Sequence, residues 1–322
     1  MVMKERIHWI DTARGFCMCL VLLYHSQARY MNNNEGAFVY VPFYTLFFFF
    51  VSGYMFPHDE FCIDKKFKSL VYKLFIPYLI ISTVLWIPKQ LIHISSISWI
   101  DYVDSVIGGR ATWFIAAFLI GNLLFLTIRY YIKNTIVLGL VSLALYIGGY
   151  WLHLADSQNA IWCYKTGMMS VLYMYVGFIF RRYEEKITLN WRILLPAYII
   201  IIYIANYVLD WHFLLGPYIV MSNLPYFLIE NIVGFMLLTA FFKVFDKNRL
   251  LEYVGKNSIA YYFFNGGIVI VCSFIVNTIF NRGAIGLIIV WCMSLLITTL
   301  VCLLINKYIP FLFDIRKIRK TR

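Results

Sequence analysis

Three ionisable residues stand out because they fall within one apolar stretch near the N-terminus, namely Asp11, Arg14 and His25. In an α-helix, which turns about 100° per residue, Arg14 and His25 lie about 20° apart around the axis and Asp11 shares their face. The i,i+3 spacing of Asp11 and Arg14 allows their side chains to pair. His25 can accept a proton near neutral pH, which makes it the natural general base for activating a hydroxyl group.

These three residues also differ in depth along the predicted helix. Arg14 and His25 are separated by roughly 16 Å along the axis. Ionisable groups inside a membrane span are costly and usually functional, so a polar line of this length is expected to face a cavity and not lipid. Two alternatives stay open: Arg14 extends to the nearer membrane surface with Asp11 as its partner, or His25 is an interfacial residue that hydrogen-bonds a neighbour.

The composition requires a membrane around these residues. Of the 322 residues 62% are hydrophobic and only 14% are charged, whereas soluble domains carry about 25% charged residues. In lipid, helices satisfy their own backbone hydrogen bonds. The sequence has no visible internal repeat and no soluble segment. We therefore expect an all-α, polytopic transmembrane helix bundle that forms a single domain over residues 1–322.

Ten apolar stretches approach the roughly 20 residues that a helix needs to cross the bilayer. They lie at 8–27, 41–57, 70–88, 111–130, 134–152, 166–181, 192–210, 226–244, 257–279 and 284–306.

The basic residues predict the orientation of these spans. Among the 28 Lys and Arg residues, Arg14 lies inside a span and only five fall on one side of the membrane, namely Arg29, Lys89, Arg110, Lys165 and Arg282. The positive-inside rule makes the other, richer side cytoplasmic, and both termini fall on it. The net charge of +12 is thus distributed as in cytoplasmic loops and not as in a nucleic-acid-binding face. We expect no nucleic-acid partner.

Motifs for several other kinds of chemistry are absent from the sequence. It contains no G-x-S-x-G nucleophile motif, no P-loop and no H-E-x-x-H. Its seven cysteines include no C-x-x-C pair. We expect neither a metal site nor a disulfide framework.

The stretch from Arg6 to Gly15, continued by Tyr24 and His25, resembles the opening of the acyltransferase-3 membrane proteins. That family's signature is a basic residue, ten residues and a His, which Arg14 and His25 match. Weaker similarities follow along nearly the whole chain: Phe47–Tyr54, Lys73–Pro77, Thr112–Phe114, and Gly255 with Ser258 and Tyr262. The sequence is most similar to the short fucose 4-O-acetylase-like branch.

One position departs from the family pattern. Members often carry His three residues after the late Tyr, where this chain has Asn265. Asn forms hydrogen bonds but cannot act as a base near pH 7, so the departure places more weight on His25.

The resemblance implies a membrane O-acyltransferase of the cell inner (plasma) membrane. Such a protein moves an acyl group, usually acetyl, from cytoplasmic acetyl-CoA to a sugar hydroxyl of a surface glycan or its lipid-linked precursor. Acetyl-CoA is then a donor substrate and not a bound cofactor; the other expected partners are the glycan or lipid-linked sugar and membrane lipid.

Residue roles follow from the resemblance. His25 is the expected base, and Asp11 orients Arg14. The expected substrate-binding residues are Ser52, Lys73, Trp113, Asn265 and Glu230. Ser52 and Trp113 are expected to line the acyl or donor channel, and Glu230 to bind a sugar hydroxyl. Lys73 is expected to meet donor phosphates together with Arg14, Lys65, Lys66 and Lys68.

Each of these roles has a simpler alternative. Ser52 with Gly53 is also a common helix-packing pair. Trp113 is also a typical interfacial aromatic residue, and the lysine cluster also follows from topology alone.

Two other functions fit a polar line through a membrane bundle. One is a transporter or flippase of a lipid-linked sugar without acyl-transfer chemistry, although transporters often contain the repeats that this sequence lacks. The other is a sensor or scaffold, which does not need an intramembrane Asp-Arg-His face.

Overall fold

The computed structural model describes residues 7–32, 41–92, 99–158, 160–310 and 312–313, most of which are helical. In this part of the chain one small sheet occurs, a hairpin of β1 (Phe213–Leu215) and β2 (Ile219–Met221). The predicted helical class is thereby confirmed. The basic residues of both termini, on which the predicted orientation partly rests, lie outside the described residues; they are Lys4, Arg6, Arg316, Lys317, Arg319, Lys320 and Arg322.

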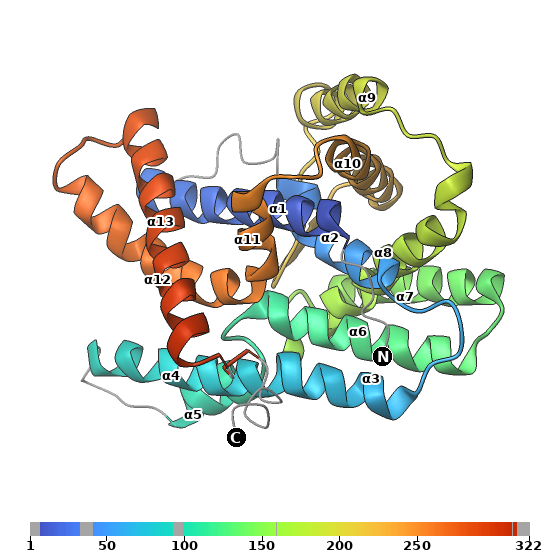
Figure 1. The fold of residues 1–322 in the computed structure, drawn as a ribbon, viewed down its shortest axis with the longest axis horizontal. Coiled ribbons are helices and arrows are strands. Elements are labelled where there is room, and N and C mark those ends of the chain that lie inside the picture. The colour runs from blue at the N-terminus through green and yellow to red at the C-terminus, as the bar shows by residue number, and fades with distance from the viewer. Residues whose placement is uncertain (1–6, 33–40, 93–98, 159, 311, 314–322) are drawn as a thin grey trace. The chain divides into compact units, whose positions relative to one another are not determined.

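The chain divides into two compact units, and unit 1 comprises residues 1–48, 187–213 and 222–309. Its elements are α1 (His8–Ser26), η1 (Gln27–Met31), most of α2 (Val41–Tyr54), α9 (Trp191–Tyr203), η7 (Ile204–Val208), α10 (Leu224–Val244), α11 (Arg249–Lys256), α12 (Ser258–Asn277) and α13 (Ala284–Tyr308). Helix α1 packs against α10, α11, α12 and α13, while α9 pairs with α10 and α12 with α13 (Figure 1). The helix that carries Asp11, Arg14 and His25 is therefore central to unit 1.

Unit 2 comprises residues 49–186, 214–221 and 310–322. Its helical elements are the end of α2, α3 (Ile63–Leu70), η3 (Val71–Phe75), α4 (Ile76–Ile92), α5 (Trp99–Tyr102), η4 (Val103–Ile107), α6 (Trp113–Tyr131), α7 (Thr135–Ala155), η5 (Ile161–Cys163), α8 (Tyr164–Tyr183) and η6 (Glu184–Lys186). Helix α6 runs beside α3 (Figure 1) and also packs on α8, which in turn packs on α7.

Glycines allow a close helix contact in unit 2. A Cβ atom on Gly53 of α2 would lie 1.8 Å from the carbonyl oxygen of Met174 in α8, and one on Gly177 would lie 1.9 Å from the carbonyl oxygen of Phe50. Only residues without a side chain allow two backbones to approach this closely. The Ser52-Gly53 pair thus serves helix packing through its glycine.

Four helices begin at asparagine residues that cap them. The side chains of Asn134, Asn190, Asn223 and Asn248 accept hydrogen bonds from backbone N–H groups in the first turns of α7, α9, α10 and α11. Asn is among the best N-cap residues because its side-chain oxygen satisfies an otherwise unpaired donor. The residues at each of these four N-termini therefore determine where the helix begins.

All ten predicted spans coincide with helical segments. Within the described residues, seven helices are long and apolar enough to cross a membrane, namely 63–87, 113–131, 135–155, 191–208, 224–244, 258–277 and 284–308. The other three predicted spans correspond to α1, α2 and α8. Helix α1 is less apolar because it carries Asp11, Arg14 and His25, α2 is short, and α8 carries Lys165, Arg181 and Arg182.

Some connections contain more structure than the sequence indicates. The predicted loop 89–110 includes α5 and η4, and the connection between the eighth and ninth predicted spans includes α11. These elements are too short for hydrophobic periodicity to identify them.

Candidate active site

Helix α1 brings Asp11, Arg14 and His25, here called the α1 stripe, onto one side of unit 1. Asp11 is buried, and its Oδ1 lies 3.8 Å from Nη1 of Arg14. This is the i,i+3 pair that the spacing predicts. The Arg14 guanidinium also lies 5.9 Å from the centre of the Phe48 ring. A partly buried cation is thus placed between a carboxylate and an aromatic ring.

A second helix fixes the position of Arg14. Its Nη2 donates a 2.6 Å hydrogen bond to Oγ of Ser258, the buried first residue of α12. Hydrogen bonds from a charged donor are stronger than neutral ones. Asp11 and Ser258 together restrict the guanidinium, so Arg14 is a positioned group.

The short helix α11 packs on α1 through backbone contacts. A Cβ atom on Gly15 would lie 1.9 Å from the carbonyl oxygen of Leu251, and one on Gly255 would lie 1.8 Å from the carbonyl oxygen of Asp11. Neither position has room for a side chain. Because Ser258 follows Gly255 by three residues, this contact also determines where Ser258 meets Arg14.

Polar contacts fasten the start of α1 to α11 and to the end of α10. Glu252 interacts with Nδ1 of His8 at 3.2 Å and with Nζ of Lys256 at 2.9 Å. Lys256 and then His8 lower the pKa of the Glu252 carboxyl group, against an opposing contribution from burial. The Thr12 hydroxyl donates a 2.7 Å hydrogen bond to the carbonyl oxygen of Asp246.

His25 is held much less firmly than Arg14. It is partly exposed near the end of α1, and its ring lies edge-on to Tyr24 with centroids 5.6 Å apart. The described residues supply no hydrogen bond to its ring nitrogens. An imidazole without such a partner can accept a proton from an incoming hydroxyl group, and catalytic hydrogen bonds often form only when substrate is present.

Asn265 lies on the same face of α12 as Ser258, because seven residues bring a helix back to within about 20°. Helix α12 runs alongside α1 in the same direction, since Ser258 meets Arg14 at one end and Cys272 packs with Tyr30 at the other. A rise of about 10 Å over seven residues therefore brings Asn265 to a level between Arg14 and His25. It is buried, and its Nδ2 has no acceptor among the described residues.

Glu230 lies in α10 and is 0% exposed. Neither of its carboxylate oxygens has a hydrogen-bond partner in the described part of the chain, and Oδ1 of Asn231 is also unpaired there. The hydroxyl groups of Tyr198 and Tyr226 lie near it. No hydrogen bond or ion pair joins Glu230 to the α1 stripe within these residues, so the structure does not gather it into the same cluster.

In unit 2, Ser52 lines a polar cavity. Its hydroxyl donates a 2.6 Å hydrogen bond to Oδ1 of Asn122, and Nδ2 of Asn122 donates to the carbonyl oxygen of Phe118. The cavity has a volume of about 190 Å³, and its lining also includes Lys66 and Ser69. Two hydroxyl residues, an amide residue and a lysine are thus among the eight residues that line this small space.

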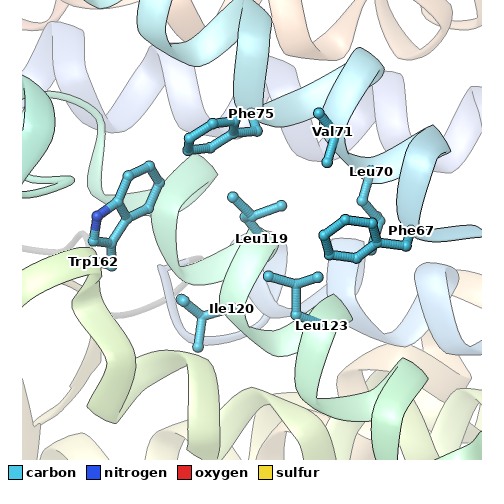
Figure 2. A pocket seen from close by; sticks show the side chains of 8 residues that line it. All are labelled: Phe67, Leu70, Val71, Phe75, Leu119, Ile120, Leu123 and Trp162. Carbon is cyan, nitrogen blue, oxygen red and sulfur yellow. The ribbon is translucent and has the colours of Figure 1, made fainter. Parts of the chain in front are cut away.

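An apolar cavity of about 280 Å³ adjoins the polar one, and Leu70 lines both. Figure 2 shows Leu119, Ile120 and Leu123 of α6 on one side, four apolar side chains from α3 and η3 on the other, and Trp162 at one end. No charged residue lines it. Its chemistry suits a hydrocarbon chain, which prefers apolar surroundings to water.

Lys73 and Trp113 line neither cavity. Lys73 is exposed on η3. Trp113 begins α6, is partly buried and packs edge-on against Phe114 with centroids 5.8 Å apart. This environment also fits the simpler alternative, an interfacial aromatic residue.

Two polar partners were not predicted as site residues, Asn122 and Ser258. The sequence indicates each of them only weakly. Asn122 is a polar residue in the middle of an apolar span, and Ser258 belongs to the late Gly-x-x-Ser pattern. Among the described residues no three His, Cys, Asp or Glu side chains are grouped closely enough to hold a metal ion, and all seven cysteines are free.

A comparison with protein-family models identifies the family. A family model described as an acyltransferase domain, of the acyltransferase-3 type, matches residues 7–307, which includes almost all elements of both units. No curated protein matches the chain, and no solved structure does.

Proposed function

The chain belongs to the acyltransferase-3 family, and on that premise we propose that it transfers an acetyl group from cytoplasmic acetyl-CoA to a sugar hydroxyl. The acceptor is a cell-surface glycan or its lipid-linked precursor. The protein is a membrane acyltransferase, so the transporter alternative loses its support. The fucose 4-O-acetylase-like branch is part of the proposal and rests on the sequence resemblance.

One observation carries the assignment of roles. On a single helix, Arg14 is fixed by Asp11 and Ser258 while His25 has no hydrogen-bond partner among the described residues. A fixed cation is suited to binding and orienting a substrate, whereas an unengaged imidazole is suited to proton transfer. This division matches the chemistry that acyl transfer requires.

The proposed reaction needs one base and no metal-binding residue. A nitrogen of the His25 ring removes the proton from the acceptor hydroxyl as its oxygen attacks the carbonyl carbon of the acetyl thioester. The new C–O ester bond forms, the C–S bond breaks, and coenzyme A leaves as a thiolate that takes up a proton. The roughly 16 Å between Arg14 and His25 is compatible with the extended arm of coenzyme A.

The other candidate residues receive supporting roles. Ser52, with Asn122, lines the donor cavity, and Trp113 borders the donor channel. Lys73 attracts donor phosphates from its exposed position. Asn265 and Glu230 supply buried polar groups for the acceptor sugar, because both carry atoms without a partner in the described part of the chain.

The proposal includes the finer topology. The chain crosses the cell inner membrane ten times, with both termini in the cytoplasm, and units 1 and 2 serve a single acyltransferase domain. The continuous family match over residues 7–307 supports the single domain.

The test is to replace His25 by Ala or Asn and to measure acetylation of surface polysaccharide by mass spectrometry, which also identifies the acceptor. General-base catalysis contributes typically 10²–10⁴-fold, so transfer should fall by about that factor. The exposed His212 provides a matched control, because His212→Ala should leave transfer unchanged. Normal acetylation by well-expressed His25 variants would refute the mechanism.

A further inference from the structure

Three guanidinium groups meet at neighbouring ends of α6 and α8 in unit 2, and Arg129, Arg181 and Arg182 are here called the arginine cluster. Nη2 of Arg129 donates a 2.8 Å hydrogen bond to the carbonyl oxygen of His58, and Nη1 of Arg181 donates a 3.1 Å bond to that of Tyr54. Arg182 lies close enough to Arg129 for their charges to repel. The cluster therefore concentrates positive charge.

Arg129 is the unusual member because it is only 7% exposed. Its Nε and Nη1 atoms are buried and have no acceptor among the described residues. No carboxylate in that part of the chain forms an ion pair with it; its other contact is the face of Phe178, 5.5 Å away. Burying a charge without a counter-charge is costly, so such a group is normally retained for a partner.

The charges of the cluster act on a neighbouring histidine, His58. The His58 ring stacks on Phe178 with centroids 4.2 Å apart, and its Nε2 is buried without a partner in the described residues. Burial, and then the charges of Arg181, Arg182 and Arg129, lower the pKa of His58.

Two carboxylates, Glu184 and Asp59, act on Tyr54 and His58 beside the cluster. Glu184 accepts a 2.5 Å hydrogen bond from the Tyr54 hydroxyl, and Asp59 is exposed.

Membrane topology explains only part of this arrangement. Basic residues are expected at the cytoplasmic ends of spans, and cations are favoured at helix C-termini. Those effects account for the exposed Arg182. They do not account for a buried guanidinium with two unpaired donors, because a topological charge gains nothing from leaving water.

The cluster also lies next to the polar cavity. Leu126 lines that cavity and precedes Arg129 by one helical turn of α6. Phe56 lines it too, and its ring packs on Phe178 with centroids 6.5 Å apart. An anion held by the arginines would thus lie at the edge of the space bounded by Ser52 and Asn122.

We propose that the arginine cluster is a phosphate-binding site. Arginine suits this ligand because its planar fork donates two parallel hydrogen bonds to phosphate oxygens. The phosphate belongs either to coenzyme A or to a phospholipid headgroup. The first source rests on the proposed function, and it would bring the donor arm to the polar cavity.

The experiment measures binding of coenzyme A to the purified full-length protein in detergent, without acceptor, by isothermal titration calorimetry. Arg182→Gln changes an exposed residue and should fold normally, while Arg129→Gln and Arg129→Lys test the buried member. Each should raise the Kd for coenzyme A roughly tenfold or more, and acetyl-pantetheine, which lacks the nucleotide phosphates, should bind all forms equally. Arg192→Gln removes an exposed arginine of unit 1 and should have no effect.

Native mass spectrometry of the same proteins counts bound phosphatidylglycerol and distinguishes the phosphate sources. Unchanged coenzyme A binding with fewer bound lipids in the cluster variants would assign the site to a lipid headgroup. If neither ligand is affected in folded variants, the phosphate site is overturned.

His25→Ala separates this inference from the proposed function. That variant should bind coenzyme A normally and fail to transfer acetyl. If the wild type acetylates glycan but the cluster variants bind both ligands normally, the phosphate-binding site is refuted and the proposed function stands. If the cluster variants bind coenzyme A weakly but the wild type acetylates no glycan, the proposed acceptor is refuted and the phosphate-binding site stands.

Discussion

Two arginines of this molecule, the partly buried Arg14 and the buried Arg129, have opposite surroundings. Arg14 in unit 1 faces a carboxylate at 3.8 Å and a hydroxyl at 2.6 Å. Arg129 in unit 2 has one carbonyl oxygen, one aromatic ring and two unpaired donors within the described residues. The difference teaches that burial alone does not define a role: Arg14 is compensated and held in position by the protein, whereas Arg129 is uncompensated among the described residues and is retained at a cost in stability for a ligand to meet.

The variant with the largest expected effect tests the contact between α1 and α11, which positions Ser258 beside Arg14. In Gly255→Ala the new methyl group would overlap the carbonyl oxygen of Asp11, 1.8 Å away, so α11 must move and carry Ser258 away from Arg14. Overpacking of this kind should cost about 3 kcal/mol and abolish most transfer. Thermal unfolding in detergent and acetyl-transfer assays measure both effects.

Gly266→Ala is the control for that change, because nothing lies within 4 Å of a Cβ atom there. It should leave stability and transfer near wild type. Equal behaviour of the two variants would mean that α11 does not hold α1.

The next test compares the arginines directly. Arg14→Met removes the guanidinium that faces the buried Asp11 carboxylate and should destabilise the protein by about 2 kcal/mol, less than for a fully enclosed pair because the Arg14 side chain is 26% exposed. Arg129→Met removes an uncompensated charge and should stabilise the ligand-free protein by about 1 kcal/mol. Thermal unfolding without coenzyme A measures both, and shifts of the same sign would remove the contrast.

The smallest effect concerns pH. The folded state lowers the pKa of Glu252, so this group contributes stability above its unfolded pKa of about 4.3 and loses that contribution as pH falls through the lowered value. Because His8 is largely exposed, the contribution should be below about 1 kcal/mol. Glu252→Gln should flatten the decline in unfolding temperature between about pH 5 and pH 3, where this contribution is lost; an unaltered decline would show that other carboxylates cause it.

The parts of the structure that were predictable are those encoded locally. The face shared by Asp11 and Arg14 follows from helical periodicity and from the rarity of ionisable groups in apolar spans. Helix positions follow from long apolar runs, and asparagines such as Asn134 and Asn248 mark the starts.

The parts that were not predictable depend on partners far along the chain. Ser52 bonds to Asn122, 70 residues away, and Arg14 to Ser258, 244 residues away. In sequence Arg129 looks like any basic residue at a span end; that two of its donors are buried without an acceptor in the described residues depends on how α6 meets α8. The eight-residue α11 is too short for a periodic signal.

The glycine contacts between α1 and α11 also limit how many residues can separate Gly255 from Ser258. Backbone lies against backbone at Gly15 and Gly255, so α11 cannot slide without forcing a side chain into a carbonyl group. One residue inserted between Gly255 and Ser258 would rotate the start of α12 by about 100° and point the hydroxyl away from the guanidinium. The same insertion in the 245–247 connection would lengthen only the chain that leads into α11, so these two adjacent segments should differ sharply in the insertions that they tolerate.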